Sequence, residues 1–273
     1  MSNEEPLAGG MDPRYAPVRV GDTVRRPAGQ ARAAVRDLLL HLEAVGFEGA
    51  PRHLGIDDRG REVLTWIEGE VPLPPYPAWA MTDAALADLG AILRRLHEAT
   101  GTFRGVSADW STQWADPLGG PVVCHNDPFP ENVVLRGGRV VALIDFAMAA
   151  PGRPLWDLAI AAQTWCPLGD PARRDQHPAA LDGVARFGIL ARGYGLDPRR
   201  GLELVDVVLE ERAHSTANVQ AEIAEGNASW IANWAASGGD DRAGADDAWI
   251  DRHRDALARS IRGAAGPGTK DGW

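Results

Sequence analysis

The chain has 273 residues, of which 45% are hydrophobic and 24% charged, and this predicts a globular protein large enough for one big domain or two small lobes. Its formal net charge of −10 at pH 7 argues against a nucleic-acid surface, because neutralising phosphates requires clustered basic side chains. No apolar run approaches the length of a membrane span, and the first residues lack the basic and apolar regions of a signal peptide. We therefore expect a soluble cytoplasmic protein, monomeric or homodimeric, without nucleic-acid or membrane partners.

The beginning of the chain predicts a β-hairpin followed by a helix. Residues 18–20 and 23–25 flank Gly21-Asp22, a short turn sequence, and Pro27 ends the second run. Apolar residues at helical spacing then predict a helix over residues 31–45.

A proline cluster over residues 72–77 divides the chain. Strand character returns over residues 62–67 and stops before this cluster, which fits neither a helix nor a central strand. We place the boundary there, with an N-terminal lobe at 1–68 and a C-terminal lobe at 69–273.

The second part of the chain predicts helices with short strands between them. Thr82 suits the N-cap of a helix that runs through Leu96. Residues 122–123 predict a strand, and residues 133–135 and 140–144 predict a hairpin around a Gly-Gly turn. Further helices are predicted at residues 154–165, 203–224 and 246–261.

Two compositional features complete this outline. The Gly-, Asp- and Ala-rich stretch 235–245 is expected to be a flexible loop, and residues 263–273 a loose tail. Cys124 and Cys166 stand in no metal-ligand or redox spacing, so we expect buried thiols rather than a disulfide.

Three polar residues between 125 and 145 carry the strongest chemical signal. Asp127 and Asn132 lie in a loop after a short apolar strand, and Asp145 ends the hairpin that follows. Phosphoryl transfer needs a carboxylate to orient a hydroxyl and accept its proton, together with oxygen ligands for Mg²⁺. A loop stiffened by Pro128 and Pro130 followed by a hairpin can bring the three side chains to one point. The alternative is an ordinary turn rich in Asx residues.

The wider motif resembles a known enzyme family. His-x-Asp-x-x-x-x-Asn at 125–132 is followed by Leu-Ile-Asp-Phe at 143–146, Pro-Gly at 151–152 and Leu-Trp-Asp-Leu-Ala at 155–159. This order is similar to that of the aminoglycoside phosphotransferase and choline kinase-like family. The resemblance implies an α+β, bilobal, protein-kinase-like fold with a small β-rich N-lobe and a larger, mostly helical C-lobe. It also implies phosphorylation of a small-molecule hydroxyl by ATP or GTP with Mg²⁺.

Site roles follow from the same resemblance, position by position. Asp127 corresponds to the catalytic base, and Asn132 and Asp145 correspond to metal ligands. His125 and Asp157 correspond to a structural pair that braces the catalytic loop, and we assign neither a catalytic role.

The predicted N-lobe is shortened and departs from the family pattern. Relatives usually carry a lysine on the third strand, paired with a glutamate on the next helix. The equivalent strand here carries Arg25 and Arg26. Alignment of Arg-Arg-Pro endings favours Arg25 as the phosphate-binding residue, whereas strand alternation puts Arg26 on one face with Val24. On the helix, neither Asp37 nor Glu43 stands clearly at the glutamate position.

Other nucleotide-binding candidates are dispersed. Gly9 and Gly10 suit a turn over phosphates, although a flexible end explains them as well. The strand before the linker offers a backbone edge to a purine, and Trp66 there suits either purine contact or packing between lobes. The remaining candidates on that strand and beside the metal-binding Asp are Thr65, Ile67 and Ile144.

The acceptor site is expected among the C-terminal helices. Glu203, Asp206 and Glu210 share one helical face, and Glu211 lies beside them. Their repulsion motivates the hypothesis of a cationic acceptor, and the alternative is a solvated helix face. Trp230, Trp234 and Trp249 could line a sugar or a quaternary amine, or pack in the core.

The leading hypothesis is therefore an active small-molecule kinase, with an aminoglycoside or amino sugar, and hence antibiotic resistance, as one candidate role. The alternative is a nucleotide-binding pseudokinase or regulatory protein, motivated by the altered N-lobe. A protein kinase is less favoured because no Ala-Pro-Glu follows Asp145.

Overall fold

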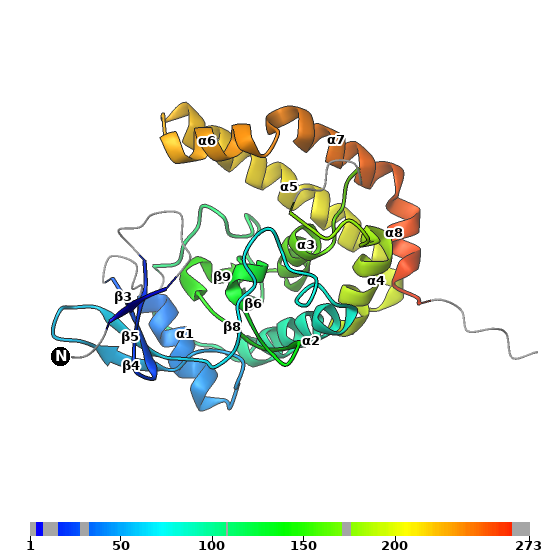
Figure 1. The fold of residues 1–273 in the computed structure, drawn as a ribbon. Helices are drawn as coiled ribbons and strands as arrows, with labels where there is room; N and C mark the ends of the chain where they lie inside the picture. The colour runs from blue at the N-terminus through cyan, green and yellow to red at the C-terminus, as the bar shows by residue number, and fades with distance from the viewer. Residues whose placement is uncertain (1–3, 8–15, 28–32, 108, 171–175, 264–273) are drawn as a thin grey trace, which may run out of the picture.

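A computed structural model of the chain describes residues 4–7, 16–27, 33–107, 109–170 and 176–263. A small lobe built on a β-sheet lies beside a larger, mostly helical lobe, and the chain passes between them after β5 (Figure 1). The two-lobed arrangement predicted from the sequence is confirmed. The exact boundary between 1–68 and 69–273 stays a prediction.

The small lobe contains an antiparallel sheet of order β1-β2-β3-β5-β4. Its strands are β1 Glu5–Pro6, β2 Val18–Val20, β3 Thr23–Arg26, β4 His53–Ile56 and β5 Glu62–Thr65. The predicted hairpin is β2–β3, whereas β1 and β4 were not predicted, since both are short and largely exposed. In the β3–β5 register, Val24 lies opposite Leu64 and Arg26 lies opposite Glu62.

Helix α1 (Ala33–Ala44) joins this sheet to the large lobe. Its apolar face, which includes Leu38 and Leu42, is fully buried. The Asp109 carboxylate, from the loop after α2 of the large lobe, accepts hydrogen bonds from the N–H groups of Ala33 and Ala34 at 2.9 and 2.7 Å. A carboxylate at this end satisfies backbone donors and interacts favourably with the helix dipole. The N-terminus of α1 is thereby fixed to the large lobe.

The helices of the large lobe include α3, which packs against α2, α4 and α5 (Figure 1). The helices of this lobe are α2 Asp83–Thr100, α3 Pro154–Trp165, α4 Gly183–Tyr194, α5 Gly201–Ala224, α6 Ala228–Ala236, α7 Gly239–Arg252 and α8 Arg254–Ser260. Trp156 and Trp165 of α3 are completely buried. None of the described helices is both long and apolar enough to cross a membrane.

Two small antiparallel pairs carry the central motif. Strands β6 (Val122–Cys124) and β9 (Ala150–Gly152) form one pair, and β7 (Val133–Arg136) and β8 (Arg139–Leu143) form the predicted hairpin. The 3₁₀ turn η3 (Pro130–Asn132) precedes β7. Cys124 and Cys166 are buried and free, as predicted.

The prediction of a flexible loop over 235–245 was wrong. Helix α6 ends within it at Ala236, and α7 begins at Gly239 and covers its remainder after a two-residue turn. Asp240 and Asp241 lie in the first turn of α7, where carboxylates favour the helix dipole, so the acidic composition that suggested a loop supports a helix start. The predicted helix 246–261 is interrupted at His253, between α7 and α8. The predicted tail beyond residue 263 lies outside the described residues.

Helices α2 and α4 approach each other closely at a pair of glycines. A methyl group on Gly90 would overlap the Leu190 carbonyl and the Tyr194 amide, and a methyl group on Gly193 would overlap the backbone of Ala87. Only hydrogen atoms fit at this crossing. The contact sets the distance between the two helices and thereby the position of Tyr194, which binds His97 near the site described below.

We expect Gly90→Ala to lower the free energy of unfolding by about 1–3 kcal/mol, because the added methyl group forces the α2 and α4 backbones apart. Urea denaturation of the purified protein measures this change. Ala91→Ser, at the neighbouring exposed position of α2, is the control and should leave stability nearly unchanged. Equal stabilities for the two variants would contradict the close contact.

Candidate active site

A buried carboxylate fixes the backbone of the catalytic-loop motif through hydrogen bonds. Asp157, in the first turn of α3, is completely buried and accepts hydrogen bonds from the backbone N–H groups of His125 and Asn126, both at 2.7 Å. His97 of α2 contacts the same carboxylate through Nε2 at 2.9 Å. Burial alone would raise the pKa of Asp157, but the hydrogen bonds from His97 and the backbone outweigh it and hold the pKa below its usual range. Asp157 therefore remains a charged acceptor.

His125 links the catalytic loop to the end of the β7–β8 hairpin. Its Nε2 donates to the Ile144 carbonyl at 3.0 Å, because a carbonyl can only accept. Its ring also packs on Phe146, with centroids 4.5 Å apart. Burial lowers the pKa of His125, so the ring is neutral and suited to bracing rather than proton transfer.

Asn126 gives the loop its sharp bend. Its backbone is left-handed, with φ of 62°, and its Nδ2 donates to the Met148 carbonyl at 3.0 Å. Asparagine tolerates this conformation better than most residues. The bend, together with the bonds to Asp157, presents Asp127 at the end of a constrained turn.

Asp127 and Asn132 are in direct contact. Asn132 Nδ2 donates to Asp127 Oδ2 at 2.7 Å and to the Asp127 carbonyl at 3.0 Å. Partial burial, followed by the nearby charges of Asp145 and Glu131, raises the pKa of Asp127 well above its usual range. An elevated pKa suits a carboxylate that accepts a proton.

Asp145 completes the set predicted from the sequence. It stands at φ of 58° before the 3₁₀ turn η4 (Phe146–Met148), and its side chain is half exposed. The backbone N–H of Ile144 donates to the Asn132 carbonyl at 2.9 Å, which holds the hairpin end beside Asn132. The structure therefore brings Asp127, Asn132 and Asp145 together.

The donor set fits a hard divalent cation. The Nδ2 of Asn132 is engaged with Asp127, which directs its amide oxygen elsewhere, and Asp145 adds a carboxylate. Carboxylate and amide oxygens are the ligands that Mg²⁺ prefers in proteins. Ala147 follows Asp145 by two positions, so no third acid stands there.

Of the two candidate arginines, Arg26 reaches the site. Its Nη1 donates to Asp145 Oδ1 at 2.8 Å, while Nε and Nη2 donate to Glu62 Oε2 at 2.9 and 2.6 Å. Arg25 lies on the other face of β3, near Asp57 at 3.5 Å. This is the orientation expected from strand alternation. Sequence reasoning missed Glu62, which could have been found only by pairing β5 with β3.

The other residues predicted to bind the nucleotide differ in their surroundings. Trp66 is stacked under the Arg19 guanidinium at 4.2 Å, and its Nε1 donates to Glu68, so its ring is occupied within the small lobe. Thr65 Oγ1 accepts a hydrogen bond from the backbone of Arg52. Ile67 and Ile144 are half-buried. Gly9 and Gly10 lie outside the described residues.

The acidic face predicted on α5 already has arginine partners. Asp206 pairs with Arg254, and Glu210 pairs with Arg153 at 2.9 Å. Glu203 pairs with Arg200 at 2.7 Å. The repulsion inferred from the sequence is therefore relieved by the chain itself.

Aromatic residues and Glu211 lie near these pairs. Trp230 of α6 stacks on Trp114 with centroids 5.2 Å apart, Trp249 stacks on His253, and Trp234 is half-buried on α6. Glu211 is buried and accepts hydrogen bonds from Gln163 and Ser215.

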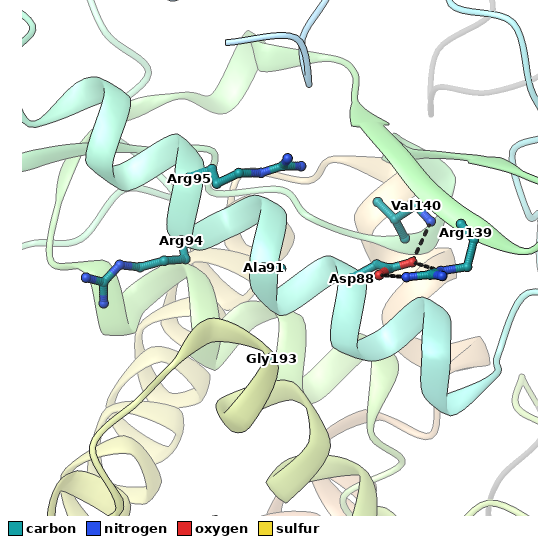
Figure 2. Close-up of a pocket in the computed structure, with 7 residues that line it drawn as sticks. All are labelled: Asp88, Ala91, Arg94, Arg95, Arg139, Val140 and Gly193. Atoms are coloured by element: carbon teal, nitrogen blue, oxygen red, sulfur yellow. Dashed lines mark hydrogen bonds and ion pairs between the residues drawn. The ribbon is translucent and has the colours of Figure 1, made fainter.

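A surface pocket of about 390 Å³ lies apart from these residues (Figure 2). It is formed by α2, the start of β8 and the end of α4, and Asp88 faces Arg139 and the Val140 amide within it. None of the predicted site residues lines it. Asp88 serves to anchor the β7–β8 hairpin to α2.

Comparison with known proteins defines the class. The model of the phosphotransferase enzyme family matches residues 106–194. The trifolitoxin immunity protein of Rhizobium leguminosarum bv. trifolii is 34% identical over 236 residues, which cover 82% of this chain and 86% of that protein. A homoserine kinase of Brucella anthropi is 30% identical over 160 residues, covering 54% of this chain and 45% of the kinase, so the chain spans less than half of that kinase.

The fold agrees with this assignment. The choline/ethanolamine kinase family protein from Mesorhizobium loti superposes with a TM-score of 0.64 at 20% identity, covering 96% of this chain and 93% of that structure. The chain belongs to the phosphotransferase enzyme family and is a phosphotransferase with the bilobal, protein-kinase-like fold. The predicted family and fold class are confirmed.

We expect Asp157→Asn to lower the free energy of unfolding by about 3 kcal/mol, because the amide replaces a charged acceptor of several hydrogen bonds with a group that also carries donors. Urea denaturation at pH 7 measures the change. Asp255→Asn, whose side chain is 78% exposed, is the matched control and should behave like the wild type. A neutral Asp157→Asn variant would contradict the bracing role.

The same substitution makes a prediction about pH. Because folding lowers the pKa of Asp157, its stabilising effect is fully present above the unfolded value of about 4 and is lost as the pH falls through the lower folded value. The stability difference between wild type and Asp157→Asn should therefore shrink as the pH is lowered below about 4. Denaturation curves at successive pH values check this, and a constant difference would contradict the depressed pKa.

Proposed function

We propose that this phosphotransferase is a kinase that moves the γ-phosphate of ATP or GTP to a hydroxyl of a small molecule, with Asp127 as catalytic base. One observation carries the proposal: the Arg26–Asp145 ion pair stands beside the Asn132–Asp127 hydrogen bond. A guanidinium, two oxygen ligands and a base therefore meet where the lobes join. Those are the groups that phosphoryl transfer requires.

In the proposed reaction, the acceptor hydroxyl oxygen forms a bond to the γ-phosphorus while the bond from phosphorus to the bridging oxygen breaks. The hydroxyl proton goes to Asp127, and the electron pair of the broken bond stays on the nucleoside diphosphate. Asn132 donates a hydrogen bond to Asp127 Oδ2, so Oδ1 would be the oxygen that accepts the proton. Arg26 neutralises phosphate charge.

Asn132 and Asp145 would hold Mg²⁺ in this proposal, and the ion would neutralise the charge on the transferring phosphates. The Asp145 side chain is half exposed, so it is accessible to a ligand.

The acceptor is best sought among three kinds of hydroxyl compound. Aminoglycosides and amino sugars follow from the family, and amino alcohols follow from the homoserine kinases among the relatives. A toxin as acceptor or binding partner follows from the name of the trifolitoxin immunity protein. A role in antibiotic resistance rests on the first and third of these.

The alternative of a nucleotide-binding pseudokinase has less support from the geometry. Asp127 and Asn132 are hydrogen-bonded to each other, and Arg26 contacts Asp145, so a base, metal ligands and a cation in place of the usual lysine are all retained in this proposal. Nucleotide binding without turnover on any acceptor would favour the alternative.

The central test is Mg²⁺-dependent nucleotide consumption with a panel of these acceptors. We expect acceptor-stimulated turnover that falls at least about 100-fold in Asp127→Asn, because the base is removed while the shape is kept. Asp255→Asn, on the exposed face of α8, is the matched control. Undiminished turnover in Asp127→Asn would overturn the assigned base, and failure to bind either nucleotide would overturn the function.

The two arginines of β3 provide a second test. We expect Arg26→Gln to raise the KM for the nucleotide about 10- to 100-fold, because charge-assisted hydrogen bonds to phosphate are lost. Arg25→Gln should change it little, since Arg25 lies on the opposite face of the strand near Asp57. Steady-state kinetics with varied nucleotide separate the two, and a larger effect at Arg25 would contradict the assignment.

A further inference from the structure

The helix that would supply a glutamate to the phosphate-binding cation offers none in this chain. Asp37 of α1 accepts a hydrogen bond from Ser107 at 2.6 Å and lies near Arg36, while Glu43 is exposed near the end of α1. Neither contacts Arg26. In protein kinases the lysine on the third strand is paired with a glutamate on this helix, and movement of the helix makes or breaks the pair.

Arg26 has its partner within the sheet instead. Glu62 is 1% exposed and Arg26 is 7% exposed, so the ion pair is almost wholly removed from water. The two residues are direct cross-strand partners in the β3–β5 register. The second carboxylate oxygen of Glu62 lies 3.8 Å from His53 Nε2. The pair is therefore set by strand pairing rather than by helix position.

The guanidinium is divided between two tasks. Its Nε and Nη2 edge is committed to Glu62 Oε2, and only Nη1 reaches Asp145. Replacing a buried ion pair by apolar residues is often neutral or stabilising, so stability alone gives weak grounds for such a pair. Its specific effect here is to fix the direction in which Nη1 points.

We infer that Glu62 is the positioning residue for Arg26 and takes over, from β5, the part that a helix glutamate has in protein kinases. This inference rests on the proposed function. Because β3 and β5 are hydrogen-bonded neighbours, the pair persists whatever the position of α1. The phosphate-binding cation is thus permanently oriented, and α1 does not act as a switch for it.

The test is nucleotide kinetics and binding of Glu62→Gln in the full chain. We expect the KM for the nucleotide to rise about tenfold, since the amide no longer holds the guanidinium by charge, while the KM for the acceptor is unchanged. Asp37→Asn and Glu43→Gln, the two acids of α1, are the matched controls and should show wild-type values for both. A purely structural role for Glu62 would not move one KM selectively.

A double variant keeps the test valid if Glu62→Gln is unstable. Arg26→Gln/Glu62→Gln removes both buried charges, and its nucleotide KM should equal that of Arg26→Gln, because Glu62 acts only through Arg26. Independent, multiplied effects would overturn the inference, as would a wild-type KM in Glu62→Gln or a strong effect of Asp37→Asn. If the wild type shows turnover and Glu62→Gln has the same nucleotide KM, the inference is refuted but the proposed function is not. Absence of nucleotide binding by the wild type would refute the proposed function with it.

Discussion

The fully buried Asp157 carboxylate is the constraint on which the catalytic segment depends. It accepts hydrogen bonds from the backbone N–H groups of His125 and Asn126, and His97 of α2 contacts the same carboxylate. A buried charge of this kind is tolerated only when several donors surround it. These donors belong to the catalytic loop and α2. The hydrogen bonds that stabilise the buried Asp157 carboxylate therefore also fix the conformation of the loop. The left-handed Asn126 then directs Asp127 away from the core.

Among the polar contacts between the two lobes, two bear on the position of Arg26. Arg26 reaches Asp145 from the sheet, and Asp109 reaches the first turn of α1 from the loop after α2. The first contact places a cation at a carboxylate that is half exposed, whereas the second fixes the helix that follows β3. The lobes are therefore joined at the end of β3 and again at the start of α1. This explains how a small sheet with short strands can present Arg26 in a defined direction.

Sequence alone located the residues whose positions depend on local chain geometry. Asp127 and Asn132 are five residues apart on one loop, and a hairpin returns Asp145 to it, so spacing was sufficient. Glu62, His97 and Asp109 were missed because each acts across a distance in sequence that only the tertiary fold closes. The choice between Arg25 and Arg26 had the same origin. Strand alternation predicted the correct orientation of Arg26. Its partner Glu62 could be identified only from the β3–β5 register.

Local composition is a poor guide to the C-terminal helices at two places. Gly and Asp residues over 235–245 suggested a loop, although carboxylates at the start of α7 favour a helix. The acidic face of α5 suggested a site for a cation, although arginines from elsewhere in the chain reach Asp206 and Glu210. A cationic acceptor at that face would have to displace Arg153 or Arg254, which costs the interaction it replaces. The net charge of −10 therefore says little about the acceptor. Discrimination among hydroxyl compounds has to come from hydrogen bonds and shape near Asp127, which a formal charge does not encode.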